Sequence, residues 1–176
     1  MNTRWISYVV AAASLGSSSL AGQARASNAF LPNAPQPQAV IVELAGLWQF
    51  DLYNPGNSSP VATGERRMRL LNDSTKLVWT EVFDTKSDTG TGILGYDSAK
   101  GVYYALGAYT HEPHPMVQIG RADRSGRTIL FAPDSGNLEI PGLLITSELR
   151  LVDSAHFEWV ASDGRWRVVF TRIGSS

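Results

Sequence analysis

The sequence contains no cysteine among its 176 residues. Without a thiol the chain forms no disulfide, uses no thiol nucleophile and offers no sulfur ligand to a metal. Its stability therefore has to come from packing, and a chain of this length can bury a single hydrophobic core.

The chain also lacks a large excess of charge of either sign. It has 15 Lys and Arg residues against 16 Asp and Glu residues, a formal net charge of −1. The one basic cluster, at Arg66, Arg67 and Arg69, is interpreted as a solvated strand edge. A nucleic-acid-binding domain needs a clustered basic face, so we expect no nucleic-acid partner.

A third absence is an apolar run long enough to cross a membrane. Residues 5–21 are uncharged, but Gly16 and three following serines interrupt the run too early to span roughly 30 Å of hydrocarbon. Arg4, the short apolar core and Ala24-Arg25-Ala26 instead predict a secretory signal peptide over residues 1–26. We therefore expect no membrane span, and an exported protein in the periplasm or the medium.

The segment after the predicted cleavage site has three prolines and few apolar anchors. We interpret residues 27–43 as a flexible leader and residues 44–174 as a single domain. Residues 40–45, where the two segments meet, have room for one helical turn and no more.

From Gly46 onward, short alternating apolar runs are separated by turn residues, and no long helix is predicted. Asp163-Gly164, between two alternating runs, is the strongest hairpin signal. Regular short strands joined by tight turns predict an all-β fold, an up-and-down antiparallel β-barrel of about 8–10 strands. The expected strands cover residues 48–53, 66–71, 77–83, 92–96, 102–109, 116–122, 128–132, 143–152, 157–161 and 166–171.

Several short motifs occur in a distinctive order over most of residues 44–172. They comprise Leu44, Gly46 and Trp48; Arg69, Leu70 and Leu71; Gly90, Gly92, Gly95, Tyr96 and Asp97, then Tyr103 and Tyr104; Gly120, Asp123 and Gly126; Glu148; Asp153 and His156; Asp163 and Gly164. This order resembles the bacterial domain-of-unknown-function group DUF1579 of the calycin-like (lipocalin-like) barrels, which implies a calycin-like barrel. Residues 111–118 and 132–143 depart from the family pattern, so a relative's ligand preference does not transfer.

Trp48 has an interpretation that does not need the resemblance. A Trp at the start of the first strand can plug one end of a barrel, and a late Arg can stack on it by a cation–π contact. Arg172 and Arg167 on the last strand are the candidates. In calycin-like barrels such a pair is structural, so we assign Trp48 and Arg172 to the fold.

Glu81 is the best candidate for a buried carboxylate. If Leu77, Trp79 and Phe83 face the interior, the alternation of a strand places Glu81 there too. Such a carboxylate can act as an acid or a base if its pKa is raised. The alternative is an ion pair with Arg66 or Arg69 on the preceding strand.

The segment His111-Glu112-Pro113-His114 resembles a metal motif, but its prolines block the helical turn that His-x-x-His needs. We therefore expect no metal and no other cofactor, and interpret the segment as a loop at the barrel mouth, where His111 remains a candidate proton-transfer group. Gly90, Gly92 and Gly95 imitate a dinucleotide fingerprint but precede no helix.

Three functions remain open, the last of them a structural or interaction module of the envelope with a filled lumen. The first is an exported barrel that binds a small apolar or amphipathic molecule in its lumen. The alternative is a metal-independent enzyme, an isomerase, cyclase or hydrolase, with Glu81, His111 and Tyr104 as catalytic candidates. The predicted ligand-binding residues are Trp79, Glu81, Tyr96, Tyr104 and His111.

Overall fold

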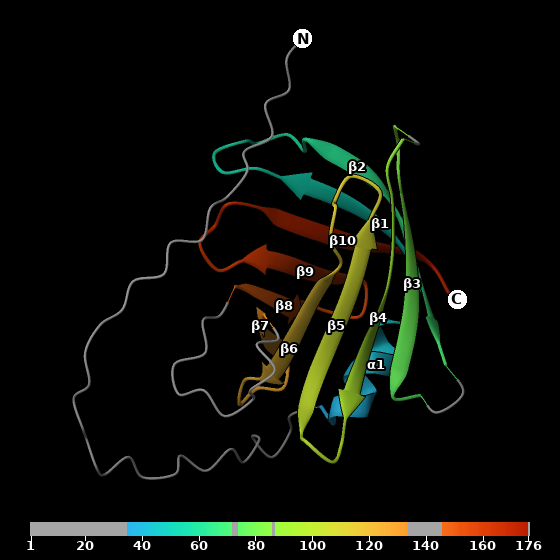
Figure 1. Ribbon diagram of the computed structural model, residues 1–176, viewed down its shortest axis with the longest axis vertical. Coiled ribbons are helices and arrows are strands. Elements are labelled where there is room, and N and C mark those ends of the chain that lie inside the picture. The colour runs from blue at the N-terminus through green and yellow to red at the C-terminus, as the bar shows by residue number, and fades with distance from the viewer. Residues whose placement is uncertain (1–34, 72–73, 86, 134–145, 176) are drawn as a thin grey trace, which may run out of the picture.

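The strands follow one another around a closed antiparallel barrel in a computed structural model that describes residues 35–71, 74–85, 87–133 and 146–175. Within these residues there are ten strands and one short helix (Figure 1). The elements are α1 (Pro37–Leu44), β1 (Gly46–Tyr53), β2 (Ala62–Leu70), β3 (Lys76–Phe83), β4 (Thr89–Asp97), β5 (Val102–Tyr109), β6 (Met116–Ala122), β7 (Thr128–Pro133), β8 (Ser147–Leu151), β9 (His156–Ala161) and β10 (Arg167–Gly174). The predicted signal peptide lies outside the described residues.

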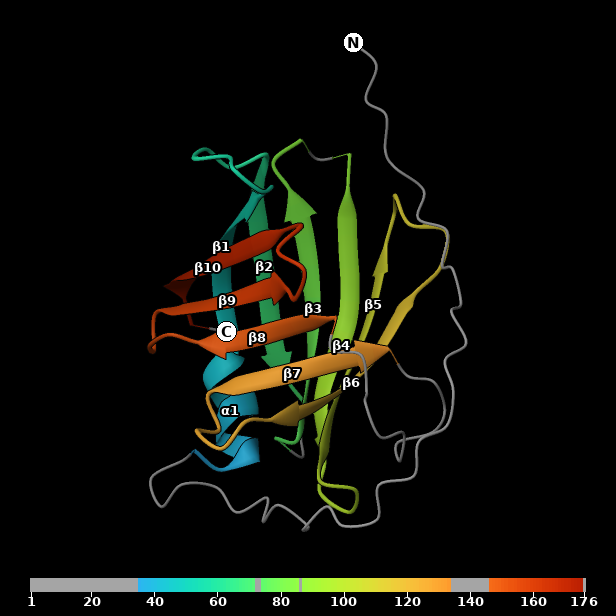
Figure 2. The same cartoon turned by 90° about the vertical axis from the view of Figure 1, so that its left-hand side faces the viewer.

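Each strand pairs with its neighbours in sequence, and β10 pairs with β1 to close the ring. Figure 2 shows this succession of strands from the side. The up-and-down barrel expected from the sequence is confirmed. Closure leaves no sheet edge unpaired, which removes the main route by which β-proteins aggregate.

Side chains alternate between the interior and the outer surface along every strand, as a pleated strand requires. On β3, for example, Leu77, Trp79 and Glu81 are buried while Thr80 and Val82 are exposed. The interior is dominated by large apolar side chains, and it contains several aromatic pairs at contact distance. These side chains form one continuous core, which agrees with the absence of disulfides.

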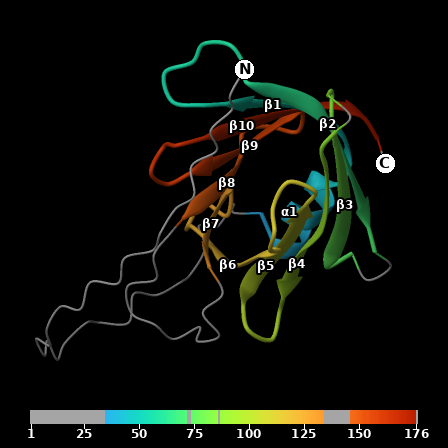
Figure 3. The same ribbon diagram turned by 45° about the horizontal axis from the view of Figure 1, so that its top comes forward.

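The helix α1 lies at one end of the barrel (Figure 3). A flexible leader over residues 27–43 and room for one helical turn at residues 40–45 were expected here; the helix instead begins at Pro37, and Pro37, Val40, Ile41 and Leu44 are buried. Pro37 suits the first turn of a helix because its missing N–H has no intrahelical partner there. The apolar residues of 37–44 cover the barrel end and are thereby ordered, which a reading of local composition alone does not reveal.

Arg66 corrects another expectation. Arg67 and Arg69 are exposed, as a solvated strand edge requires, but Arg66 is only 4% exposed. In a strand of alternating orientation, Arg66 shares the inner face with Met68. The basic cluster is therefore divided between the two sides of the barrel wall.

Candidate functional site

The two ends of the barrel are built differently. At the α1 end, Arg172 lies over the Trp48 ring, 4.1 Å from guanidinium carbon to centroid. Its Nη1 donates to the Ala45 carbonyl at 2.7 Å, and Trp48 Nε1 donates to the Leu44 carbonyl at 2.9 Å. Arg172 thus ties the last strand to the helix. The contact expected between Trp48 and a late arginine is present, and it is formed by Arg172 rather than Arg167.

Gly46 makes this arrangement possible. Its φ of +151° lies in a region that residues with a side chain rarely adopt, and a Cβ there would collide with the Arg172 guanidinium. The Gly-x-Trp motif therefore has a physical basis, because the glycine makes room for the cation that stacks on the tryptophan.

The candidate site lies in the barrel interior and extends from Arg66, which is paired with Trp48 on β1, to Tyr109 at the end of β5 farther from α1. Arg66 on β2 stands directly opposite Glu81 on β3, and both residues are 4% exposed. Arg66 Nε donates to Glu81 Oε2 at 2.5 Å, and Arg66 Nη2 forms an ion pair with the same oxygen. The simpler of the two interpretations of Glu81, an ion pair with Arg66, is what the structure contains.

Aromatic rings surround the Arg66 guanidinium. Its central carbon is 4.6 Å from the ring centroids of both Trp79 and Phe170 and 5.9 Å from that of Trp159. Such contacts compensate part of the cost of removing the cation from water. The pocket of rings therefore holds a positive charge that is already paired with Glu81.

Glycines leave space for the Trp79 indole. A Cβ on Gly92 would collide with the indole and with the Leu106 carbonyl, and one on Gly107 would lie 3.2 Å from the indole. The Gly90-x-Gly92 spacing that imitates a nucleotide motif thus serves close packing of an aromatic ring. This is the role that a glycine within a strand often has.

A second buried polar group lies across the interior from Glu81. Gln118 Nε2 donates to Ser147 Oγ at 3.3 Å, and Trp159 Nε1 donates to the same hydroxyl oxygen at 3.1 Å. Trp159 therefore connects this group with Arg66, whose guanidinium lies over its ring.

Two polar atoms of this interior have no hydrogen-bond partner among the described residues. They are Arg66 Nη1, a donor, and Gln118 Oε1, an acceptor. Turning the Gln118 amide over would only exchange which of its two atoms lacks a partner. Buried polar groups are nearly always hydrogen-bonded, and each exception calls for an explanation. Both exceptions belong to residues near Trp159, since Arg66 lies over its ring and Gln118 shares the Ser147 hydroxyl with its indole N–H.

Tyr109 forms the boundary between this interior and the end of the barrel farther from α1. Arg66 Nη2 donates to the Tyr109 hydroxyl at 3.3 Å. Burial raises the pKa of Tyr109 above 10, the nearby Glu81 charge adds to the rise, and Arg66 partly opposes it. The phenol therefore stays protonated at neutral pH, where it is a hydrogen-bonding group and not a base.

Beyond Tyr109, partly exposed apolar side chains form a rim. Phe83, Tyr109, Trp166 and Val168 pack against the core from this end. His111, 42% exposed, lies 5.4 Å from Tyr109 and 6.3 Å from Phe83 between ring centroids. We call Phe83, Tyr109, His111, Trp166 and Val168 the aromatic rim.

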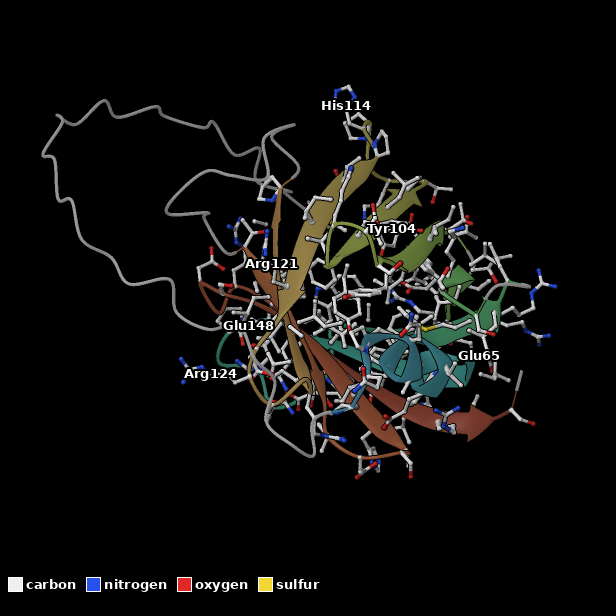
Figure 4. The ribbon with its side chains drawn as sticks, turned by 90° about the horizontal axis from the view of Figure 1, so that it is seen from below. Glu65, Tyr104, His114, Arg121, Arg124 and Glu148 are labelled. Carbon is white, nitrogen blue, oxygen red and sulfur yellow. The ribbon has the colours of Figure 1, made fainter. Side chains whose placement is uncertain are left out.

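His111 is oriented by an acidic neighbour. Its Nδ1 is 3.4 Å from Asp88 Oδ1, and that oxygen accepts a hydrogen bond from the Thr110 hydroxyl at 3.1 Å. His114 is exposed and projects from the loop between β5 and β6, away from the barrel (Figure 4). The two histidines of the apparent motif thus do not converge, and the described residues contain no group of three potential metal ligands.

The structure brings together some of the residues predicted to bind a ligand and separates others. Trp79 and Glu81 both contact Arg66, and His111 lies above them at the rim. Tyr96 lies toward the α1 end, 5.0 Å from Tyr103 between centroids.

Tyr104 lies on the other side of the wall. It follows the inward-facing Tyr103 on β5, and its phenol covers the outer surface of Gly95 on β4. A side chain in this position does not reach the Arg66 and Glu81 cluster. Strand alternation alone predicts this, because Tyr103 and Tyr104 are adjacent and cannot both face inward.

The sequence prediction of the site did not include three of its members: Arg66, Gln118 and Trp159. Their signal was present in the alternation, since Arg66 is in phase with Met68 and Gln118 with Gly120. Gln118 on β6 and Ser147 on β8 are not on paired strands, and their side chains meet in the interior across β7, which no local pattern reveals.

One described concavity, of about 550 Å³, lies elsewhere. It is bounded by the turn after β1, by Gly164 and by the outward-facing Tyr53, Arg167 and Val169. Arg167 is already paired with Glu158 at 2.7 Å. The concavity is open and lined mainly by turn residues, and it contains none of the buried polar atoms, so we do not place the site there.

None of the helices in the described part of the chain has the length and apolar character needed to cross a bilayer. No family model matches this chain, and no curated protein is significantly similar to it.

Proposed function

We propose that this protein binds a small apolar or amphipathic molecule at the end of the barrel farther from α1. The apolar part of the ligand contacts the aromatic rim and the rings of Trp79 and Trp159, while its polar part reaches Arg66. The observation that carries the proposal is Arg66 Nη1, a donor of a buried cation that has no partner among the described residues. Aromatic and apolar side chains with a few convergent polar groups are the usual lining of a small-molecule site.

The arrangement of the barrel supports binding at this end rather than the other. At the α1 end, the helix and the Trp48–Arg172 pair fill the barrel, and Arg172 already donates to two backbone carbonyls there, those of Glu43 and Ala45. At the other end, side chains of the aromatic rim are only partly buried. Packed structure closes the α1 end, whereas the rings at the other end are partly exposed. We therefore propose that the ligand enters at the aromatic rim.

A thermal-shift screen tests this proposal. A panel of apolar and amphipathic compounds is measured against the wild type and the double variant R66M/E81L, which replaces the ion pair with apolar groups of similar size. A ligand at 100 times its dissociation constant adds about 2.7 kcal/mol, or roughly 5–10 °C for a protein of this size. E65Q, on the outer face of β2, serves as the matched control.

We expect at least one compound to raise the melting temperature of the wild type and of E65Q, but not that of R66M/E81L. If no compound stabilises the wild type, the proposal is wrong. If a compound stabilises all three proteins equally, binding occurs elsewhere.

The enzyme alternative now depends on His111. Glu81 is committed to Arg66, and the raised pKa of Tyr109 keeps its proton in place, but the imidazole of His111 lies next to Asp88 at the rim. A proton-transfer enzyme would convert a bound compound over hours, and H111Q would bind it unchanged. Mass spectrometry of the compound after incubation distinguishes the two functions, because a binding protein returns it intact in both cases.

Export is part of the proposal and is supported by the pattern of residues 1–26. The protein in its own host is expected in the periplasm or the medium, with Ser27 as its first residue. N-terminal sequencing of the protein from cell fractions checks this, and a cytoplasmic protein that retains residues 1–26 would contradict it. The proposed relationship to the DUF1579 group rests on the motifs quoted above.

A further inference from the structure

The charges buried around the candidate site limit the kind of ligand that it can accept. Among the described residues, Arg66 and Glu81 are the only charged side chains that are buried. They stand opposite each other in adjacent strands and form a direct ion pair. The interior therefore has a net charge of zero before any ligand enters.

The other ionisable groups nearby do not change this balance. Tyr109 keeps its proton at neutral pH, because burial raises its pKa. At the rim, His111 faces Asp88, so a positive charge on the imidazole is offset by the adjacent carboxylate. Arg172 belongs to the opposite end, over Trp48.

Two hydrogen-bonding positions remain unused. They do not provide the additional positive charge that binding of an anion would require. Arg66 Nη1 offers one N–H donor, and the Gln118 amide, which shares the Ser147 hydroxyl with Trp159, offers one further polar atom. A carboxylate or phosphate would bring a full negative charge next to Glu81 without a second cation to balance it. The desolvation of an unbalanced ion is far more costly than that of a neutral polar group.

We propose that the ligand is uncharged: a planar, largely apolar molecule whose carbonyl or hydroxyl oxygen accepts a hydrogen bond from Arg66 Nη1 and whose second polar group pairs with the Gln118 amide. A primary amide or a hydroxyketone on a ring system has this chemistry. The flat part of the molecule lies against the Trp79 and Trp159 rings. This inference rests on the proposed binding function and adds the chemical class of the ligand.

A pair of probes of nearly equal shape tests the charge preference. 2-Naphthamide is neutral, whereas 2-naphthoate is an anion at pH 7. Binding of each to the full mature chain is measured by isothermal titration at fixed ionic strength. We expect the wild type to bind 2-naphthamide at least tenfold more tightly than 2-naphthoate.

Variants then assign the preference to the named residues. E81Q removes the compensating negative charge and should shift the ratio of the two affinities at least tenfold toward 2-naphthoate. Q118M should weaken binding of 2-naphthamide about threefold to tenfold, the value of one neutral hydrogen bond. If E81Q does not fold, the ratio of the two affinities in the wild type and the effect of Q118M on 2-naphthamide binding still test the proposal. E65Q, with the same change of charge on the outer face of β2, should leave both affinities unchanged.

Equal affinities in the wild type, or tighter binding of 2-naphthoate, would overturn the neutral-ligand proposal and leave the binding function standing. If neither probe binds, the proposal is tested on the molecule that the protein retains when it is purified from its own host. The charge of that molecule then decides between a neutral and an anionic ligand. A neutral molecule supports the inference and an anionic one overturns it. The absence of any bound molecule, with no stabilising compound in the thermal-shift screen, overturns the binding function and this inference together.

Discussion

Removal of the negative charge at Glu81 is the sharpest test of how the barrel interior is built. In E81Q the shape of the side chain is retained, but the buried Arg66 cation loses its counter-charge. Breaking a buried ion pair by removing one partner costs about 3–5 kcal/mol, because an uncompensated charge remains in the interior. The rings of Trp79 and Phe170 stay near the cation and place the expected value toward the lower end of this range.

Urea unfolding followed by tryptophan fluorescence measures this cost. With a denaturant slope of about 2 kcal/mol per molar urea, the midpoint of E81Q should lie about 1.5–2.5 M below that of the wild type. E65Q makes the same chemical change on the exposed side of β2 and should stay within about 0.5 kcal/mol of the wild type. R66M/E81L should recover most of the loss, since an apolar replacement leaves no buried charge.

Equal midpoints for E81Q and E65Q would refute the reasoning. They would mean that Glu81 is solvated, or that Arg66 does not depend on it. A double variant that is less stable than E81Q would also contradict the account, because it would assign the stability to the pair itself and not to the avoidance of an unpaired charge.

Three further predictions concern the packing and the tyrosines. Gly92→Ala places a methyl group into the indole beneath it and should cost about 1–3 kcal/mol in urea unfolding, whereas Gly174→Ala, with only ordinary contacts, should cost less than about 1 kcal/mol. Arg172→Met removes the cation and its hydrogen bonds to the helix and should lower stability by about 2–3 kcal/mol, with loss of protection in hydrogen exchange over residues 37–44; unchanged protection there would contradict the tie. Burial raises the pKa values of Tyr103 and Tyr109 above 10, so the unfolded chain releases these protons first and stability should fall as the pH rises above 10. A Y103F/Y109F variant should show a shallower fall in urea titrations at high pH, and an unchanged slope would refute the assignment.

The sequence was sufficient to predict the barrel because alternation and turn signals are local. Asp163-Gly164 lies in the turn between β9 and β10, and Trp48 and Arg172 meet where the first and last strands pair. The inward orientation of Glu81 followed from alternation, and the order of strands predicted a partner in Arg66 or Arg69; the register of β2 and β3 selects Arg66. These features require only that neighbouring strands pair.

The rest of the site depends on contacts across the interior, which no local pattern contains. Gln118 and Ser147 are separated by 29 residues and meet because β6, β7 and β8 curve around the barrel. The helix α1 was underestimated for a related reason. Its residues are ordered by the barrel end that they cover, and its short, proline-rich sequence predicts little helix by itself.

The central claim is that the end of the barrel farther from α1 holds a small molecule through Arg66. The most direct measurement is native mass spectrometry of the mature protein purified from its own host, compared with R66M/E81L prepared in the same way. The account predicts that the wild type carries an additional non-covalent mass of a small molecule and that the variant, folded by circular dichroism, does not. A wild-type protein found only at the mass of its polypeptide, or a variant that retains the same molecule to the same extent, would contradict it.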